Sequence, residues 1–479
     1  MGAEIGGSAF SEEARAEFQR RLRDETKTLK RWFDERRFTY SEGFTGGLEV
    51  EAWLVDENAL PAPENEAFLA NLNHPLVVPE LSRFNFEINT DPYALTGDYL
   101  SKSRDTLERV WGNCAAKARE MALRPAMVGI LPTVRDDDLQ PGAMSPSNRY
   151  AALTAELFRL RNDAPVRIRI EGEDALSLTC RHIMVEAACT SLQVHLQINQ
   201  EEAARFYNAS QIIAGPIIAA SANSPFLYGN SLWAESRIPA FEQAAEAFGF
   251  RDRHGRMVGR VTLGSDYARR SLLELFLENI DGYPVLLPAL SEEKLEKLPH
   301  LRLQNGTIWR WNRPILGFDG AGEPHLRIEH RTMPSGPTIP DMVANMALYL
   351  GLAIALARTE TPPEAELSFD ACYRNFYACA KEGLRARIEW PGLGEVDVQA
   401  LLHDRLAPLA KEALHSLGLT RADLDYYFDD VLARRFLTGR NGAEWQRNYV
   451  DLHGKDFQRL TERYLTLQEG GEPVHAWTC

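Results

Sequence analysis

Four segments of the sequence alternate apolar with polar residues, and charged side chains recur on the polar side of each. Successive side chains of a β-strand point to opposite faces, so each polar set shares one face. The segments are 47–55, 83–89, 191–199 and 325–331, and their polar sides carry Glu49, Glu51, Glu87, His195, Glu329 and Arg331. A single strand of this kind is ordinarily solvated on its polar face, but the coincidence of four indicates a functional surface.

The spacing of these residues suits metal and phosphate chemistry. Glu49 and Glu51 lie two residues apart, and like charges this close repel each other unless a cation or a proton intervenes. Mg²⁺ prefers carboxylate oxygens together with waters and phosphates. Arg331 follows Glu329 by two residues and places an anion-binding guanidinium beside a potential metal ligand. The combination favours phosphoryl transfer, in which cations neutralise charge.

The sequence patterns around these residues predict an α+β fold. Strands with one apolar and one polar face are typical of an antiparallel sheet that is covered by helices on one side and lines a cavity on the other. Residues 307–313 indicate a neighbouring strand of similar character. Apolar residues recur at helical spacing over 12–37, from about residue 98 onward, and over 147–162. We therefore expect a curved, mainly antiparallel sheet backed by helices.

The chain after residue 338 is largely helical by the same criterion. Helical spacing of apolar residues covers 340–358, 364–387, 396–417, 421–437 and 445–467. Pro362-Pro363 and Pro391-Gly392 indicate turns between helices, and no linker precedes this region. We expect residues 1–479 to form a single catalytic unit, in which a mostly helical region, 339–479, packs on a sheet-rich core, 40–338.

Composition excludes several classes of protein. The 53 Lys and Arg residues against 68 Asp and Glu residues give a net charge of −15, which disfavours a nucleic-acid partner. The longest apolar run, 212–222, is too short for a membrane span and contains Gly215 and Pro216. The residues before the charged run from Glu12 are small and polar, so we expect no signal peptide, and the six cysteines form no C-x-x-C pair. We expect a cytoplasmic protein with reduced thiols and no membrane partner.

An ordered set of short motifs resembles one known family. The motifs are Gly47-Leu48-Glu49-Val50-Glu51, Glu80 followed by Phe86-Glu87-Ile88-Asn89-Thr90, Ser191-Leu192-Gln193-Val194-His195, Ala222-Asn223-Ser224-Pro225-Phe226 and Arg327-Ile328-Glu329-His330-Arg331. Their order and approximate spacing from residue 45 to 345 resemble the glutamate–cysteine ligase family, in particular its bacterial carboxylate–amine ligase branch. The segment 438–443 looks similar too.

The resemblance implies the fold of glutamine synthetase and the guanidino kinases, whose curved sheet binds ATP and divalent metals on its concave face. It makes 40–338 the ATP- and metal-binding core. Carried over by position, Glu49, His195 and Glu329 would hold an Mg²⁺ or Mn²⁺ ion at the nucleotide's phosphates, and Glu51, Glu80 and Glu87 a second ion facing the amino-acid substrate. Because Glu80 lies an odd seven residues from Glu87, a turn or bulge must intervene between them.

The reaction that the resemblance implies joins a carboxylate to an amine. ATP would activate the carboxylate as an acyl phosphate, which the amine then attacks. Arg331 would stabilise the transferring phosphoryl group with help from Arg313. Asn223 and Ser224 would lie near the substrate, and Arg237 would pair with a substrate carboxylate. Each of these three also has a structural interpretation, as a turn before Pro225 and as a surface arginine.

The residues leave other interpretations open. Trp309 and Trp311 either wall the cavity or pack in the core, and Cys189 is expected to be an inert buried thiol. The partners implied are small-molecule carboxylate and amine substrates, with γ-glutamyl transfer as the specific form, and no residue identifies cysteine as the acceptor. A homo-oligomer is left open. The alternatives are an ATP-dependent phosphotransferase of the same fold, or a catalytically silent nucleotide-binding regulatory protein.

Overall fold

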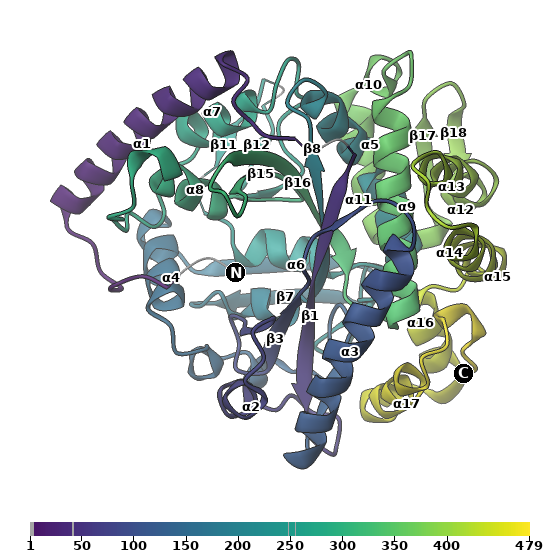
Figure 1. Cartoon of the computed structure of the whole chain (residues 1–479). Coiled ribbons are helices and arrows are strands. Elements are labelled where there is room, and N and C mark those ends of the chain that lie inside the picture. Colours follow the sequence, from purple (N-terminus) through teal and green to yellow (C-terminus); the bar gives the residue numbers. More distant parts are fainter. Residues whose placement is uncertain (1–3, 41–42, 248, 254) are drawn as a thin grey trace.

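The computed structural model describes residues 4–40, 43–247, 249–253 and 255–479 and is built around one curled sheet of eight strands. The strand order is β15-β16-β8-β1-β3-β2, with β4 and β5 paired to β1, and every pairing in it is antiparallel (Figure 1). The strands are β1 (Thr45–Val55), β2 (Val77–Pro79), β3 (Asn85–Asn89), β4 (Tyr93–Ala94), β5 (Arg124–Ala126), β8 (Ser191–Ile198), β15 (Asn312–Phe318) and β16 (Pro324–Pro334). This architecture confirms the predicted α+β class.

Strand register brings the polar residues together. Glu329 on β16 lies directly opposite His195 on β8, and Arg313 on β15 lies opposite Glu329. Glu51 on β1 lies opposite Glu87 on β3. Directly opposite residues of an antiparallel pair share a face with their Cβ atoms about 5 Å apart. Strand pairing therefore places the polar residues of neighbouring strands side by side on one face of the sheet.

The other face of the sheet is the main core of the protein. Leu48, Val50, Ala52 and Leu54 of β1 are buried there. Helices α5 (Ala203–Ser221) and α9 (Ile339–Ala357) pack against each other beside this face, as Figure 1 shows. By length and composition α9 could cross a membrane, but 94% of its apolar window is buried inside the protein, as in a core helix. Each buried valine or leucine side chain in this core contributes about 1.5–3 kcal/mol of hydrophobic stabilisation.

Further helices surround the polar face and extend the core. In Figure 1, α1, α7 and α8 lie on the far side of the molecule from α9, with α4 below them. The remaining α-helices are α1 (Glu12–Asp34), α2 (Asn65–Leu72), α3 (Tyr99–Glu120), α4 (Asn148–Leu160), α6 (Arg237–Ala244), α7 (Leu273–Gly282), α8 (Pro299–Gly306), α10 (Pro363–Glu366), α11 (Phe369–Glu382), α12 (Val398–Leu401), α13 (Ala407–Ser416), α14 (Arg421–Leu424), α15 (Arg434–Thr438), α16 (Gly442–His453) and α17 (Phe457–Gly470). The predicted helices at 12–37, 98 and 147–162 correspond to α1, α3 and α4.

Among the described residues, five small two-stranded sheets accompany the main sheet. They pair β6 (Val166–Glu171) with β7 (Ala175–Cys180), β9 (Phe226–Leu227) with β10 (Asn230–Ser231), β11 (Phe250–Arg251) with β12 (Met257–Val258), β13 (Val261–Thr262) with β14 (Trp309–Arg310), and β17 (Arg387–Trp390) with β18 (Gly394–Asp397). The predicted strand at 307–313 is thus divided, because β14 pairs with β13 whereas β15 joins the main sheet. Trp309 faces the polar cavity and Trp311 is buried in the core.

Two predictions in the carboxyl-terminal region are wrong in detail. Pro391-Gly392 is the turn of the β17–β18 hairpin, not a turn between helices, and Ile388 and Trp390 are buried by it. Residues 445–467 form two helices, because Gly454 has a φ of +83° that ends α16, and Asp456 caps α17. Helix α9 packs against α5, α13 and α3. That residues 1–479 act as a single catalytic unit stays a prediction.

Candidate active site

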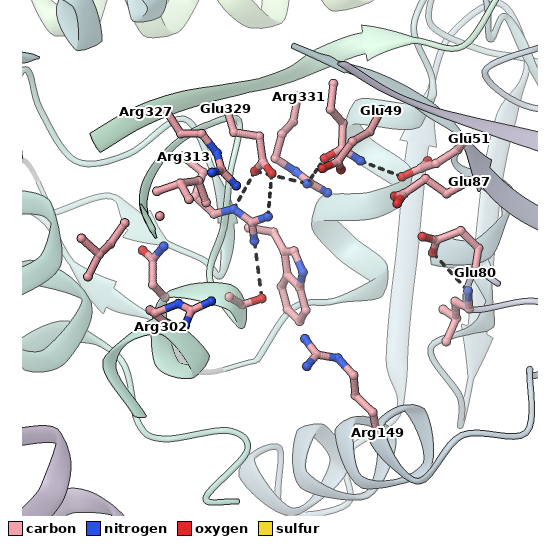
Figure 2. Close-up of a pocket in the computed structure, with 18 of the residues that line it drawn as sticks. Glu49, Glu51, Glu80, Glu87, Arg149, Arg302, Arg313, Arg327, Glu329 and Arg331 are labelled. Carbon is pink, nitrogen blue, oxygen red and sulfur yellow. Dashed lines mark hydrogen bonds and ion pairs between the residues drawn. The ribbon is translucent and has the colours of Figure 1, made fainter. Parts of the chain in front are cut away.

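A polar cavity of about 450 Å³ lies between the polar face of the sheet and helices α4 and α8. Figure 2 shows Glu51, Glu80 and Glu87 on one side, Arg302, Arg313 and Arg327 on the other, and Arg149 on the wall opposite Glu329 and Arg331. Its charged lining is Glu49, Glu51, Glu80, Glu87, Arg149, Glu186, Arg302, Arg313, Arg327, Glu329 and Arg331. The sheet therefore contributes most of the charge, and the helices close the opposite wall.

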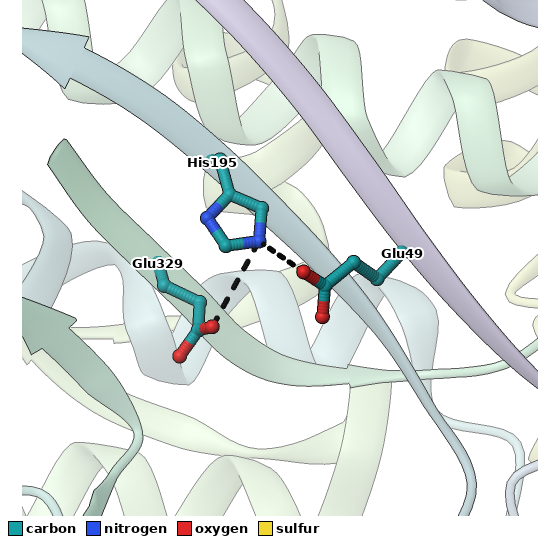
Figure 3. Close-up of side chains that lie close together, drawn as sticks. All are labelled: Glu49, His195 and Glu329. Carbon is teal, nitrogen blue, oxygen red and sulfur yellow. Dashed lines mark hydrogen bonds and ion pairs between the residues drawn. The ribbon is translucent and has the colours of Figure 1, made fainter. Parts of the chain in front are cut away.

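Glu49, His195 and Glu329 form the first cluster of potential metal ligands. Their donor atoms lie within 4.8 Å of one another. His195 Nε2 is 3.0 Å from Glu49 Oε1 and 3.8 Å from Glu329 Oε1 (Figure 3). Arg327 Nε donates to His195 Nδ1 at 3.1 Å, so Nε2 carries the ring proton toward Glu49. A divalent cation in the cluster would compete with that proton.

Glu51, Glu80 and Glu87 form the second cluster, again with donor oxygens within 4.8 Å of one another. Glu80 follows β2, which pairs with β3, and the turn between these two strands returns Glu80 to the side of Glu87. Glu80 and Glu87 are seven residues apart, and the turn between them allows both to lie on the same side, as predicted. Ser191 N and Gln193 Nε2 donate to the Glu51 carboxylate at 2.7 and 2.9 Å. These bonds fix the position of one ligand.

The two clusters differ in how their charge is balanced. Arg313 donates to both oxygens of Glu329, at 2.6 and 3.0 Å, and Arg331 Nη1 lies 3.3 Å from Glu329 Oε2. Arg331 also donates to Gln193 Oε1. Fork-shaped contacts of this kind suit carboxylate and phosphate oxygens alike. Arg331 links the two clusters, because it contacts Glu329 and also Gln193, which donates to Glu51. Arg313, on β15 at the end of the sheet, contacts Glu329 from the other side, and a phosphoryl group could bind at these two guanidinium groups.

The charged groups near each carboxyl, together with burial, determine its pKa. Burial alone would raise the pKa of Glu49, but the adjacent His195 overcomes it and lowers the pKa to about 2. Arg313 and Arg331 likewise overcome burial at Glu329 and hold its pKa below its usual range. Burial raises the pKa of Glu87 to about 7, helped by Glu49 and Glu51.

Burial shifts the pKa values of the other two carboxyls of the second cluster in the same direction. Burial, with Glu87 and Glu51, also raises the pKa of Glu80 well above its ordinary value. The pKa of Glu51 is raised by burial, although Arg331 opposes the change. Oxygen donors that repel one another at neutral pH are a set that a divalent cation would stabilise. The donor sets of both clusters therefore fit Mg²⁺ or Mn²⁺.

A second cavity of about 740 Å³ adjoins the first and shares Glu49, Arg327 and Phe318 with it. Its wall is more apolar and includes Tyr40, Leu48, Pro92 and His325, and His195 of the first cluster faces it. Flat apolar side chains beside a charged cluster would suit an aromatic ligand that carries anionic groups. The first cluster thus lies at the junction of an apolar and a polar compartment.

Three predicted substrate residues lie elsewhere in the structure. Asn223, Ser224 and Arg237 are at most 2% exposed and do not line either cavity. Ser224 Oγ and Arg237 Nε donate to the carboxylate of Glu235 at 2.7 and 3.1 Å. Asn223 bonds to Ser335 and Tyr464. Because these polar groups already have protein partners, the structure supports a positioning role outside the two cavities.

Several cavity residues were not predicted. Gln193 and Arg327 lie on the polar sides of strands that the alternation identified, so a signal for them was present. Arg149 and Arg302 come from the helices of the opposite wall, and Glu186 from a short 3₁₀-helix, Met184–Ala188. Nothing in the local sequence distinguishes these three from surface charges. Cys189 is half-buried near Arg237, and burial raises the pKa of its thiol, in keeping with the expected inert state.

Comparison with known proteins gives one family match. A family model described as glutamate-cysteine ligase family 2 matches residues 45–463. A search of curated proteins finds no significant match.

Solved structures with the same fold include two ligases. The glutamate–cysteine ligase of Francisella tularensis, solved in complex with AMP, is 11% identical with a TM-score of 0.51, and the match covers 92% of this chain and 90% of that one. The bifunctional glutathione synthetase of Pasteurella multocida is 10% identical with a TM-score of 0.53. That match covers 95% of this chain but only 55% of the synthetase, so this chain corresponds to about half of it.

Proposed function

Because the chain belongs to glutamate-cysteine ligase family 2 and is therefore an ATP-dependent ligase that forms carbon–nitrogen bonds, we propose that it joins a small-molecule carboxylate to an amine through an acyl phosphate. Amino acids are the expected substrates, with γ-glutamyl transfer as the specific form. The observation that carries the proposal is the pair of three-donor clusters on one face of a sheet, with Arg313 and Arg331 both in contact with Glu329 of the first cluster.

The two cavities suggest how the substrates would be arranged. The nucleoside of ATP would occupy the more apolar cavity, beside Tyr40 and Phe318. Its phosphates would extend past Glu49 and His195 toward the polar cavity, where the carboxylate substrate would bind. Glu49, His195 and Glu329 would hold one cation and Glu51, Glu80 and Glu87 a second. Bound Mg²⁺ or Mn²⁺ would screen the phosphate charge and orient the phosphates.

The chain's own residues would act on the transferring phosphoryl group. A substrate carboxylate oxygen attacks the γ-phosphorus of ATP, and the bond from that phosphorus to the bridging oxygen breaks, releasing ADP. Arg331 and Arg313 would donate to the equatorial oxygens during transfer, since their guanidinium groups already contact a carboxylate at that place. The amine then attacks the acyl carbon and phosphate leaves.

The test is a matrix of substrates with product analysis. Purified protein is incubated with ATP, Mg²⁺ and pairs of amino acids or simple amines, and ADP, phosphate and new amides are measured by mass spectrometry. We expect phosphate release that requires both a carboxylate and an amine. Transfer of phosphate to a stable product without any amine would instead support a phosphotransferase and overturn the ligase mechanism.

A further inference from the structure

Glu186 is a carboxylate of the polar cavity that the two metal clusters leave unused. It lies on the 3₁₀-helix Met184–Ala188, immediately before β8, and lines the cavity beside Glu51 and Arg331. It belongs to neither three-donor cluster. Within the part of the chain that the structure describes, its side chain makes no hydrogen bond or ion pair with another residue.

The charged residues that line the cavity differ in the contacts they make. Five of the carboxylates that line it are the ligands of the two clusters: Glu49, Glu51, Glu80, Glu87 and Glu329. Arg313 and Arg331 contact Glu329. Among the described residues that line the cavity, Glu186 is the remaining carboxylate. A carboxylate in such a place has no evident structural partner, so a cationic ligand would be its natural complement.

The proposed reaction supplies such a ligand. An amine substrate is an ammonium ion at neutral pH, and it must lose a proton before its nitrogen can attack an acyl carbon. Arginines at the phosphoryl position repel an ammonium ion, whereas a carboxylate attracts it. Glu186 lines the cavity outside both clusters, where a bound ammonium ion would hold its carboxylate in the charged form until the proton is transferred. Burial raises the pKa of Glu186 above its ordinary value, which favours acceptance of that proton.

We infer that Glu186 binds the ammonium group of the incoming amine and accepts its proton, an inference that rests on the proposed ligase function. The ammonium ion donates a hydrogen bond to the carboxylate and then transfers that proton, leaving a neutral amine. The amine lone pair forms the carbon–nitrogen bond, and the bond between the acyl carbon and the phosphate oxygen breaks. The second amine proton leaves with the phosphate, so that the products are the amide, hydrogen phosphate and protonated Glu186.

Hydroxylamine separates this step from the one before it. It is largely uncharged at neutral pH and traps acyl phosphates as hydroxamates without prior loss of a proton. Wild-type protein and Glu186→Gln are each given ATP, Mg²⁺ and L-glutamate or another proteinogenic amino acid as the carboxylate. One series contains hydroxylamine and a second contains amino-acid acceptors or methylamine. We expect Glu186→Gln to form hydroxamate at close to the wild-type rate but to form amide at least 10²-fold more slowly, with a higher KM for the amine.

A matched variant controls for loss of a buried carboxyl. Glu242 is also buried, its pKa is also raised by burial to about 7, and it accepts hydrogen bonds from Trp311 and Tyr377 outside the cavity. Glu242→Gln keeps an acceptor for both donors and should leave the ratio of the two products unchanged. Glu186→Asp retains the charge one methylene farther back and should recover part of the amide rate. Thermal melting establishes that each variant is folded.

The outcomes distinguish the inference from its premise. Equal loss of hydroxamate and amide in a folded Glu186→Gln protein would assign Glu186 to phosphoryl transfer and overturn the inference. Wild-type amide rates in that variant would overturn it as well. Absence of both products from the wild-type protein with every carboxylate would refute the ligase proposal itself. Hydroxamate and amide formation by the wild type, with selective loss of amide in the variant, would support both.

Discussion

Replacing Glu87 by glutamine should stabilise the metal-free protein above neutral pH and reduce its stabilisation by magnesium. Glu87 is 2% exposed and lies opposite Glu51 in the sheet. Burial, then Glu49 and Glu51, raise the pKa of its carboxyl from 4.5 to about 7. The folded protein therefore binds this proton more tightly than the unfolded chain does. The contribution of Glu87 to stability is complete below pH 4.5 and is lost as the pH rises to 7.

The size of the effect follows from the two pKa values. The pKa of Glu87 differs between 4.5 in the unfolded chain and about 7 in the folded protein. This difference corresponds to a loss of roughly 3 kcal/mol in the free energy of unfolding above pH 7. Glutamine carries no charge and keeps an acceptor for Asn89 Nδ2, which lies 2.9 Å from Glu87 Oε1. Glu87→Gln should regain up to about 3 kcal/mol at pH 8 and little at pH 4.5. For a chain of this length, 1 kcal/mol shifts the Tm by about 1 °C.

The assay is thermal melting with EDTA at pH 4.5 and pH 8, followed by titration with Mg²⁺ at pH 8. We expect a higher Tm for Glu87→Gln than for wild type at pH 8 only, and a smaller rise in its Tm on adding Mg²⁺. Glu57→Gln, at an exposed position, is the control and should change neither quantity. A variant that is less stable than wild type at pH 8, or equally stabilised at both pH values, would refute the electrostatic explanation.

Three further predictions concern the two clusters and Arg331, which contacts Glu329. Chelation of divalent metals should abolish turnover and added Mg²⁺ or Mn²⁺ should restore it; full turnover in metal-free buffer would exclude metal-held ATP. Glu51→Gln should abolish turnover while the protein stays folded, since it removes charge from a crowded face, and a collapsed thermal melt would indicate a structural role. Arg331→Lys should lower kcat about 10²-fold, or by roughly 3 kcal/mol of transition-state stabilisation, with a smaller effect on ATP affinity. Single-turnover rates and ATP binding measure the two effects, and an equal loss in both would make Arg331 a ground-state nucleotide anchor.

The sequence predicted much of the site because strand alternation is local. Glu49, Glu51, His195 and Glu329 each lie on the polar side of a strand whose other side is apolar, and burial of the apolar side leaves the polar side facing the cavity. One prediction in the carboxyl-terminal region failed because the same turn residues occur in two kinds of connection. Pro391-Gly392 suits a turn between helices and the turn of a hairpin equally, and the pairing of β17 with β18 decided between them.

Alternation alone could not say which substrate residues reach the cavity. Asn223 and Ser224 belong to a recognisable motif and Arg237 follows it, but their side chains form hydrogen bonds with Glu235, Ser335 and Tyr464 outside the cavities. Ser335 and Tyr464 come from distant parts of the chain, whereas Glu235 is near in sequence to Ser224 and Arg237. Buried polar side chains need hydrogen-bond partners, and the tertiary structure decides which groups lie close enough to be those partners.

The sequence by itself determined which residues share a face of each strand, because the two-residue period of a strand is fixed by backbone geometry. The tertiary structure decided which faces meet. Strand order and register placed Glu329 opposite His195 and Glu51 opposite Glu87, although these partners lie far apart or in separate motifs along the chain. It also brought Arg149 and Glu186 to the same cavity from segments without any strand pattern. Their place depends on how helices and turns pack over the sheet, which no local period encodes.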